Sequence, residues 1–410
     1  MKPSRLQIST AATRLTLVAV ISLLAMIAAT LVAVGASADA NPMPRAQSEG
    51  PCDIYAVAKT PCVAAYSSTR ALSRSYDGKL YQVQRASDNR TSDIGVRVAG
   101  GFADAAKQVR FCAHTTCVVS KIYDQSGNGN TLVPQGPTTA FYSNTNWSHD
   151  PVDAAKLPVY AGGEPVYGFR FDSSSPTGIP CLSAKLCINN RGQAYNNGNR
   201  RAKGVAVGAQ PESTYAVFSG QHTGDQCCFD FGNSEISGTD NGPGHMDALN
   251  FGRACWNQCG PGTGPWVQAD LEDGMFMTGQ PVYVPFRPGG VVGGSFRQGL
   301  GACCGSTERN LAMPYPFVSA MLDSPGEGTF AIRGSPSEAS DLTTFYDGPV
   351  PPGKGYSPME KEGAIILGSG GDQGTADGAF FEGAMTFGVP SLAVQNAVQR
   401  NIAGVNYQLR

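Results

Sequence analysis

Short apolar runs separated by turn-forming residues follow one another along most of the chain. The runs are rich in β-branched and aromatic residues, and Gly, Asn, Asp and Pro lie between them, which indicates short β-strands. Strands at this spacing are typical of an antiparallel β-sandwich. We therefore predict an all-β fold with few short helices. The predicted strands lie in LYQVQR (80–85), VVSKIYDQSGNGN (118–130), STYAVFSG (213–220), PWVQADLEDGMF (265–276), GAIILGSGGD (363–372) and GAFFEGAMTFG (378–388).

Helical patterning is confined to the two ends of this region. Residues Asp53 to Leu72 combine alanines with potential capping residues. Near the C-terminus, Ser391 precedes three apolar residues at a spacing of four, and Gly404 follows them as a stop signal. These apolar residues are Val394, Val398 and Ile402. The pattern predicts one amphipathic helix.

The first 40 residues have the pattern of a secretory signal. Lys2, Arg5 and Arg14 precede an apolar run at 15–35, and small residues at 36–40 offer cleavage sites. The run is also long enough to span a bilayer, so an uncleaved anchor is the alternative. We predict a signal at 1–40, a short linker at 41–48 and a single domain, large enough to be catalytic, at 49–410. The mature chain is then expected to be secreted and extracellular.

Composition narrows the classes of partner. The net charge of -2 gives no electrostatic argument for binding nucleic acid or an anionic membrane. The 51 glycines and the 15% of charged residues suggest tight turns and a surface for a neutral substrate. We expect a monomer that binds neither nucleic acid nor, after signal cleavage, a membrane, and that has no metal and no cofactor.

All twelve cysteines follow the predicted signal, and an even number in an exported chain favours disulfides. Three pairs are close in sequence, so small-loop disulfides are their simplest assignment. These pairs are Cys52–Cys62, Cys112–Cys117 and Cys181–Cys187. The connectivity of Cys255, Cys259, Cys303 and Cys304 stays open. A zinc site among these four is disfavoured, because the chain is exported and their spacing matches no common zinc module.

Candidate acids lie in the segment 265–276. If this segment is a strand, Asp270 and Glu272 share one face, because side chains alternate, and lie about 6 to 7 Å apart. The alternative is a solvated edge of the sandwich. The nearby Trp256 and Trp266 favour a sugar-binding groove, since aromatic rings pack against the apolar face of a sugar.

A further acid, Asp372, follows an apolar run on a glycine-rich loop. The glycines allow a tight loop with the acid at its tip, although a turn-stabilising role is the alternative. No Lys-Ser/Thr follows, so the loop does not match a phosphate-binding motif. Glycoside hydrolysis needs one ionised carboxylate and one protonated acid, and Glu272 and Asp372 are candidates for these roles.

Other polar motifs have simpler interpretations. No G-x-S-x-G motif accompanies the four histidines, so a serine hydrolase is disfavoured. We expect His245 to support a neighbouring carboxylate or a turn. Residues 122–130 are expected to form a polar turn stabilised by Asp and Asn side chains. A Ca²⁺ site there would lack the spacing of an EF-hand.

Six segments together resemble the catalytic domain of the α-L-arabinofuranosidases of glycoside hydrolase family 54. The likeness runs in order from about Gly50 to Tyr407. It implies a concanavalin-like jelly roll, an antiparallel β-sandwich, and a retaining double displacement. The segments are GPCDIYAVAKTPCVAAYSSTRALS (50–73), YDQSGNGN (123–130), CCFDFGNSE (227–235), GHMDALNFG (244–252), PWVQADLED (265–273) and KEGAIILGSGGD (361–372).

The resemblance implies an exo-α-L-arabinofuranosidase that releases terminal non-reducing residues from arabinoxylan, arabinan or related plant cell-wall polysaccharides or oligosaccharides. It assigns the nucleophile to Glu272 and the general acid/base to Asp372. It assigns sugar binding to Asp270, the Gly371 backbone and Trp256. It also implies the disulfides Cys52–Cys62 and Cys112–Cys117, and a strained vicinal pair, Cys227–Cys228, in the arabinose pocket.

The sequence departs from the family pattern around the expected pocket. Asp273 and Gly274 follow the nucleophile where the family typically has two asparagines, and we include Asp273 among the substrate-binding candidates. An insertion surrounds Trp256. The chain ends at Arg410, where fungal members continue into an arabinose-binding β-trefoil module, so we expect no such module.

Other function classes stay open at this point. A non-catalytic lectin-like sandwich would bind sugar without releasing arabinose. A related glycosidase, such as a xylosidase or a galactofuranosidase, would differ in pocket shape near Asp273. A structural wall or surface protein would have no use for six enzyme-like motifs.

Overall fold

The computed structural model describes residues 49–135, 138–139, 146–172, 191–224, 228–238, 241–254, 260–272, 274–279, 309–352, 355–369 and 376–410. The chain divides into two compact units, Met1–Arg45 and Ala46–Arg410, and the described residues all belong to the second. The predicted signal therefore lies outside them. Within these ranges, no helix is long and apolar enough to cross a membrane.

The described ranges contain a few short helices and many strands. The helices are α2 (Pro51–Val57), α3 (Ala105–Phe111) and α4 (Leu392–Val405). The strands are β1 (Cys62–Ser67), β2 (Lys79–Arg85), β3 (Thr91–Gly95), β4 (Cys117–Ile122), β5 (Val133–Pro134), β6 (Thr138–Thr139), β7 (Asn146–His149), β8 (Leu157–Ala161), β9 (Glu164–Phe171), β10 (Arg191–Gly192), β11 (Ala194–Asn196), β12 (Glu212–Phe218), β13 (Phe229–Ser234), β14 (Asp247–Gly252), β15 (Trp266–Asp270), β16 (Met275–Phe276), β17 (Val318–Ser324), β18 (Thr329–Pro336), β19 (Thr343–Pro349), β20 (Ala364–Ser369), β21 (Gly378–Phe387) and β22 (Gln408–Leu409).

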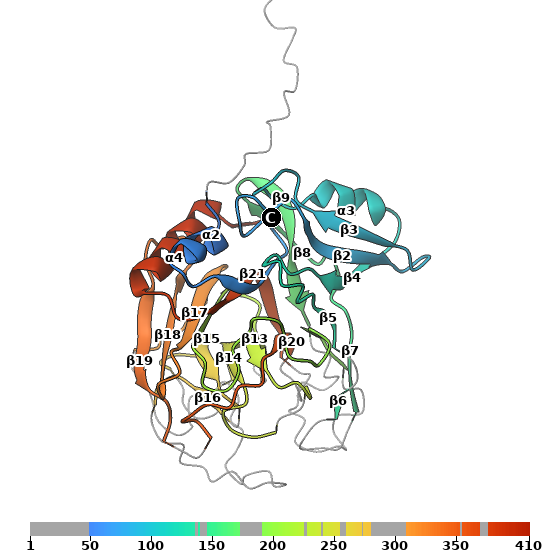
Figure 1. Cartoon of the computed structure of the whole chain (residues 1–410). Coiled ribbons are helices and arrows are strands. Elements are labelled where there is room, and N and C mark those ends of the chain that lie inside the picture. The colour runs from blue at the N-terminus through green and yellow to red at the C-terminus, as the bar shows by residue number, and fades with distance from the viewer. Residues whose placement is uncertain are drawn as a thin grey trace, which may run out of the picture. The chain divides into compact units, whose positions relative to one another are not determined.

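Two large sheets form the sandwich (Figure 1). One has the order β19-β18-β17-β12-β21-β9-β8-β22, with β1 also paired to β21, and the other has the order β16-β15-β14-β13-β20-β11-β5. Aromatic side chains join them: Phe218 of β12 stacks on Phe251 of β14 at 5.3 Å between ring centroids. Phe231 of β13 meets Phe380 of β21 at the same separation. The predicted all-β sandwich is confirmed, and all six predicted strand segments contain strands.

The N-terminal helical pattern is only partly right. Helix α2 ends at Val57, and the chain then enters β1 within the segment 53–72. The alanines of β1, Ala64 and Ala65, are fully buried against the core, where a small side chain suits close packing in a sheet. Their tertiary environment therefore outweighs their helical propensity. The sequence pattern did not predict α3.

The C-terminal helix is confirmed with a different stop. The Ser391 hydroxyl accepts a hydrogen bond from Val394 N, which caps the N-terminus of α4. Val398 and Ile402 are fully buried, as the spacing of four predicts. The helix continues through Gly404 and ends at Val405, and the residue that follows, Asn406, has the left-handed conformation (φ 53°) that often terminates helices.

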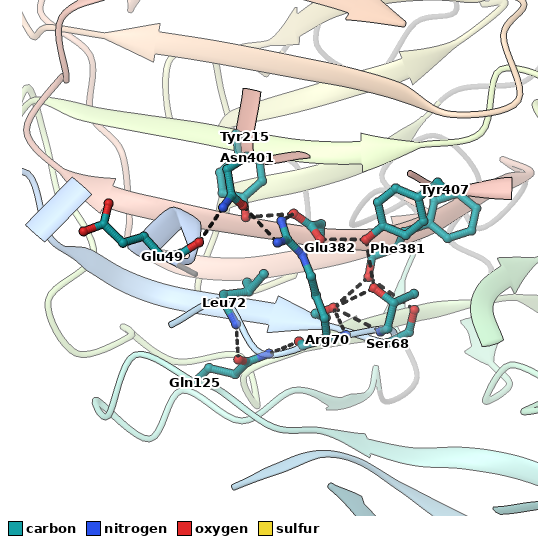
Figure 2. Close-up of polar contacts among 12 residues, drawn as sticks. Glu49, Ser68, Arg70, Leu72, Gln125, Tyr215, Phe381, Glu382, Asn401 and Tyr407 are labelled. Carbon is teal, nitrogen blue, oxygen red and sulfur yellow. Dashed lines mark hydrogen bonds and ion pairs between the residues drawn. The ribbon is translucent and has the colours of Figure 1, made fainter. Parts of the chain in front are cut away.

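A buried ion pair joins the beginning and the end of the sandwich (Figure 2). The guanidinium of Arg70, just after β1, donates two hydrogen bonds to the Glu382 carboxylate in β21, and both side chains are fully buried. The Tyr407 hydroxyl donates to the same carboxylate at 2.6 Å. Asn401 of α4 accepts from Arg70 at 2.9 Å. This network connects the segment after β1 with β21, α4 and the C-terminal residues, more than 300 residues further along the chain.

The predicted polar turn at 122–130 is confirmed. The Asp124 carboxylate accepts hydrogen bonds from the backbone N–H groups of Ala65, Ser126 and Asn130. The side chains of Asn128 and Asn130 both donate to Val63 O. The turn is therefore fastened to β1 by its Asp and Asn side chains.

Candidate active site

Four neighbouring strands of the second sheet, β15, β14, β13 and β20, carry the candidate site (Figure 1). Gln268 of β15 pairs with Asn250 of β14, which pairs with Asp230 of β13. Paired residues of antiparallel strands share a face, so these three side chains form a polar row. All three are buried. The opposite face carries Phe251 and Phe231 into the core.

Hydrogen bonds fix the polar row. Asn250 Nδ2 donates to Asp230 Oδ1 at 2.7 Å, and Gln268 Nε2 donates to Asn250 Oδ1 at 3.3 Å and to Ala254 O at 2.8 Å. These bonds orient the Asp230 carboxylate at the centre of the sheet. The solvated-edge alternative for 265–276 is wrong, because both faces of β15 are buried.

Asp270, the last residue of β15, lies beside this row. Suitable atoms of Cys228, Asp230 and Asp270 all lie within 4.8 Å of one another. Cys228 is disulfide-bonded and its Sγ lies 3.7 Å from Met275 Sδ. A disulfide sulfur is not a thiolate, so the group offers two carboxylates to a ligand rather than three metal ligands. Asp230 was not among the residues predicted for the site, although alternation in FDFGNS places it on a face with Gly232 and Ser234.

Glu272 follows β15 in a strained turn. The strand ends at Asp270, so the predicted alternation does not extend to Glu272. Glu272 has φ 63°, a left-handed conformation that is uncommon for residues other than glycine. Its N–H donates to Asp270 Oδ1 at 3.1 Å, and its backbone oxygen accepts from the Tyr356 hydroxyl at 2.9 Å. Its side chain is buried, and Oε2 has no hydrogen-bond partner among the described residues.

The loop that carries Asp372 and Gly371 lies outside the described residues, but its two ends are placed. Strand β20 ends at Ser369, which pairs with Phe229 in β13. The Ser369 hydroxyl donates to Ala376 O at 3.2 Å. This bond joins the ends of the loop at the strand next to the one that carries Asp230.

Other predicted site residues have mixed outcomes. Asp273, Trp256 and Cys227 lie outside the described residues. The disulfides Cys52–Cys62 and Cys112–Cys117 are present, whereas Cys181–Cys187 and the four cysteines of open connectivity also lie outside the described part. Trp266 is fully buried and donates from Nε1 to Pro261 O at 3.3 Å, so it offers no ring face to a sugar.

His245 contacts carboxylates, as predicted. Its Nδ1 lies 3.1 Å from Glu362 Oε1, and its Nε2 lies 3.4 Å from Glu360 Oε2. Burial raises the pKa of Glu362, but hydrogen bonds from Ile236 N, Asn241 and His245 outweigh burial and lower that pKa overall. The ionised carboxylate therefore connects Ile236, Asn241 and His245 to the segment 360–362.

A buried charged group lies between the two sheets. Lys361 Nζ lies 3.3 Å from Glu212 Oε1 and 3.4 Å from Asp247 Oδ2. Glu212 begins β12 in one sheet, and Asp247 begins β14 in the other. Burial and the neighbouring Asp247 raise the pKa of Glu212 to about 8, against the attraction of Lys361. The group links the sheet of the site to the sheet that supports it.

The sequence is similar to those of known proteins over most of its length. The sequence model of "Alpha-L-arabinofuranosidase B, catalytic" matches residues 51–289 and 287–408. Alpha-L-arabinofuranosidase B of Aspergillus niger is 42% identical over 362 residues, which cover 88% of this chain and 64% of that protein. The probable alpha-L-arabinofuranosidase B of Aspergillus fumigatus is 42% identical over 87% of this chain and 62% of its own length. The chain thus spans less than two thirds of these relatives.

The fold is also similar to solved structures of arabinofuranosidases. A GH54 α-L-arabinofuranosidase soaked with a cyclic sulfate inhibitor superposes with a TM-score of 0.74 at 40% identity, over 88% of this chain and 66% of that one. An arabinofuranosidase complexed with arabinofuranosyl-α-1,2-xylobiose has the same TM-score and coverage at 38% identity. Because the family model matches most of the sequence, this chain belongs to the α-L-arabinofuranosidase B catalytic family, glycoside hydrolase family 54.

Proposed function

We propose that this protein is a retaining exo-α-L-arabinofuranosidase. The observation that carries the proposal is the Glu272 carboxylate, which is buried on a strained turn with Oε2 unpartnered among the described residues, in a chain of the arabinofuranosidase B family. A buried carboxylate oxygen without a hydrogen-bond partner is costly unless a ligand compensates for it. An arabinofuranosyl unit would provide the missing contact.

The proposed reaction has two steps. Glu272 attacks the anomeric carbon with a carboxylate oxygen while the bond to the leaving group breaks, and Asp372 donates its proton to the departing oxygen. Asp372 then takes a proton from water, the water oxygen attacks the same carbon, and the bond to Glu272 breaks. Two inversions release arabinose with its configuration retained, and both acids return to their starting states.

The remaining polar groups would hold the sugar. Asp270 and Asp230 offer two carboxylates within reach of one another, beside the sulfur of Cys228. We assign hydroxyl binding to Asp270, Asp273 and the Gly371 backbone. We assign the apolar wall to Trp256 and the Cys227–Cys228 pair.

The proposed substrates are terminal non-reducing arabinofuranosyl units on arabinoxylan, arabinan or related side chains and oligosaccharides. One relative was crystallised with arabinofuranosyl-α-1,2-xylobiose, which supports a xylan-linked arabinose. The two described disulfides are consistent with an oxidising compartment. Together with the signal pattern at 1–40, they support secretion.

A nucleophile variant tests the proposal. Wild-type protein is expected to cleave an aryl α-L-arabinofuranoside, and Glu272→Gln is expected to lower kcat more than about a thousandfold, because an amide cannot form the glycosyl intermediate. Glu338→Gln, the same change at an exposed residue, serves as the control and should retain wild-type turnover. Near wild-type turnover of Glu272→Gln would show that the nucleophile is misassigned.

Two further readouts separate the competing functions. Proton NMR of the first product formed should show the α-anomer, whereas an initial β-anomer would contradict retention. Binding of arabinose-containing oligosaccharides without release of arabinose would instead favour the lectin-like alternative. Faster release of xylose or galactofuranose than of arabinose from matched aryl glycosides would reassign the specificity.

A further inference from the structure

The backbone of Glu272 needs external support. A left-handed conformation costs free energy for a residue with a long side chain, and such strain persists only where surrounding contacts hold it. Asp270 supplies one contact through Glu272 N, but it belongs to the same short segment. Support from elsewhere in the chain comes from Tyr356, whose hydroxyl donates to Glu272 O at 2.9 Å.

Tyr356 is itself firmly placed. It is 6% exposed, and its ring meets the Phe276 ring edge-on at 5.2 Å. Phe276 lies in β16, which pairs with Ala269 of β15. The ring of Tyr356 therefore packs against the strand that follows the turn, while its hydroxyl bonds the turn itself.

The segment around Gly244 completes the support. Gly244 N donates to Leu271 O at 2.8 Å, on the residue before Glu272. A Cβ added to Gly244 would lie 1.8 Å from Gly355 O, so this glycine allows the two segments to approach closely next to Tyr356. Glu360 N also donates to Gly244 O at 2.9 Å. Hydrogen bonds from Gly244 and Tyr356 thus fix the backbone of residues 271 and 272.

We propose that Tyr356 is a positioning residue for the reaction: its hydroxyl fixes the backbone of Glu272, and thereby the place of the Oε2 atom. This inference rests on the proposed function, because it takes Glu272 as the reacting group. Tyr356 acts through the Glu272 backbone rather than on the sugar. Its loss should therefore affect the chemical step more than substrate binding.

The test is Tyr356→Phe, which removes one oxygen atom and keeps the ring. We expect kcat on an aryl α-L-arabinofuranoside to fall about tenfold, as for one hydrogen bond lost from positioning, with KM changed less than about twofold. A crystal structure of the variant should show Glu272 displaced or with an altered φ.

Tyr66→Phe is the matched control. The Tyr66 hydroxyl is also buried and also donates to a backbone oxygen, but Tyr66 lies in β1 and its acceptor, Asn130 O, lies in the polar turn at 122–130. This control should lower the denaturation midpoint and leave kcat unchanged. An equal loss of kcat in both variants would show a general stability effect and would overturn the proposal.

The inference and the function can fail separately. Wild-type kcat in Tyr356→Phe, with activity lost in Glu272→Gln, would refute the positioning role and leave the proposed function intact. Failure of the wild type to cleave any arabinofuranoside would refute the proposed function. The Glu272 conformation in the Tyr356→Phe crystal would then still decide whether Tyr356 holds the turn, and an unchanged turn would overturn that role.

Discussion

At the scale of single residues, Glu212 makes folding dependent on pH. The pKa of Glu212 is raised by burial and by Asp247 from 4.5 to about 8. Between these values the folded state keeps the Glu212 proton and the unfolded state has lost it, so the free energy of unfolding falls as pH rises. The slope from one group is at most about 1.4 kcal/mol per pH unit.

We expect Glu212→Gln to remove this contribution, since an amide does not titrate. Urea unfolding of wild type and variant, at several pH values across the window, gives the difference between their stabilities. The free energy of unfolding of the variant should rise relative to that of the wild type as pH increases. For the exposed control Glu338→Gln, the curve of unfolding free energy against pH should run parallel to the wild-type curve. Parallel curves for Glu212→Gln would mean that Glu212 is ionised throughout the window.

Single residues also mark the limit of what sequence patterns predict. Asp270 and Glu272 were predicted from alternation and resemblance, yet the strand ends at Asp270, and the left-handed conformation of Glu272 follows no periodic pattern. The Glu272 backbone is held by a hydrogen bond from the Tyr356 hydroxyl, and Tyr356 lies 84 residues further along the chain. Asp230 was not singled out, because alternation in FDFGNS places it on a polar face but does not show that this face is buried beside Asp270. Its orientation requires Asn250 and Gln268 on two further strands.

At the scale of elements, α4 depends on its cap. Ser391→Ala removes the acceptor for Val394 N and should lower the free energy of unfolding by about 1 kcal/mol. Ser340→Ala, at an exposed serine, should change it by less than about 0.5 kcal/mol. Denaturant titration checks both values. Equal effects of the two substitutions would show that the cap contributes nothing.

Elements with strong periodicity were predicted well. The spacing of apolar residues identified α4, and the apolar runs identified β12, β20 and β21. The helical prediction for the alanine-rich residues 53–72 was only partly right, because alanine suits both a helix and a close-packed strand such as β1. The sequence does not show which strands become neighbours, since pairing depends on contacts between distant segments.

At the scale of the whole molecule, the buried pair of Arg70 and Glu382 connects segments from opposite ends of the sandwich sequence (Figure 2). Arg70→Met leaves the Glu382 charge buried without its partner and should cost about 3 to 5 kcal/mol. Arg85→Met breaks the surface pair with Asp88 and should cost at most about 1 kcal/mol. Unfolding in denaturant measures both, and similar small losses would argue against an ionised buried pair.

Strand β21 pairs with β1, β12 and β9, and residues 378–387 form it near the end of the chain. A chain still emerging from the ribosome therefore lacks the strand with which these three others pair. We expect the sandwich to close only after synthesis is nearly finished. A chain that ends before residue 378 lacks β21 and should therefore be degraded by proteases that a folded sandwich resists.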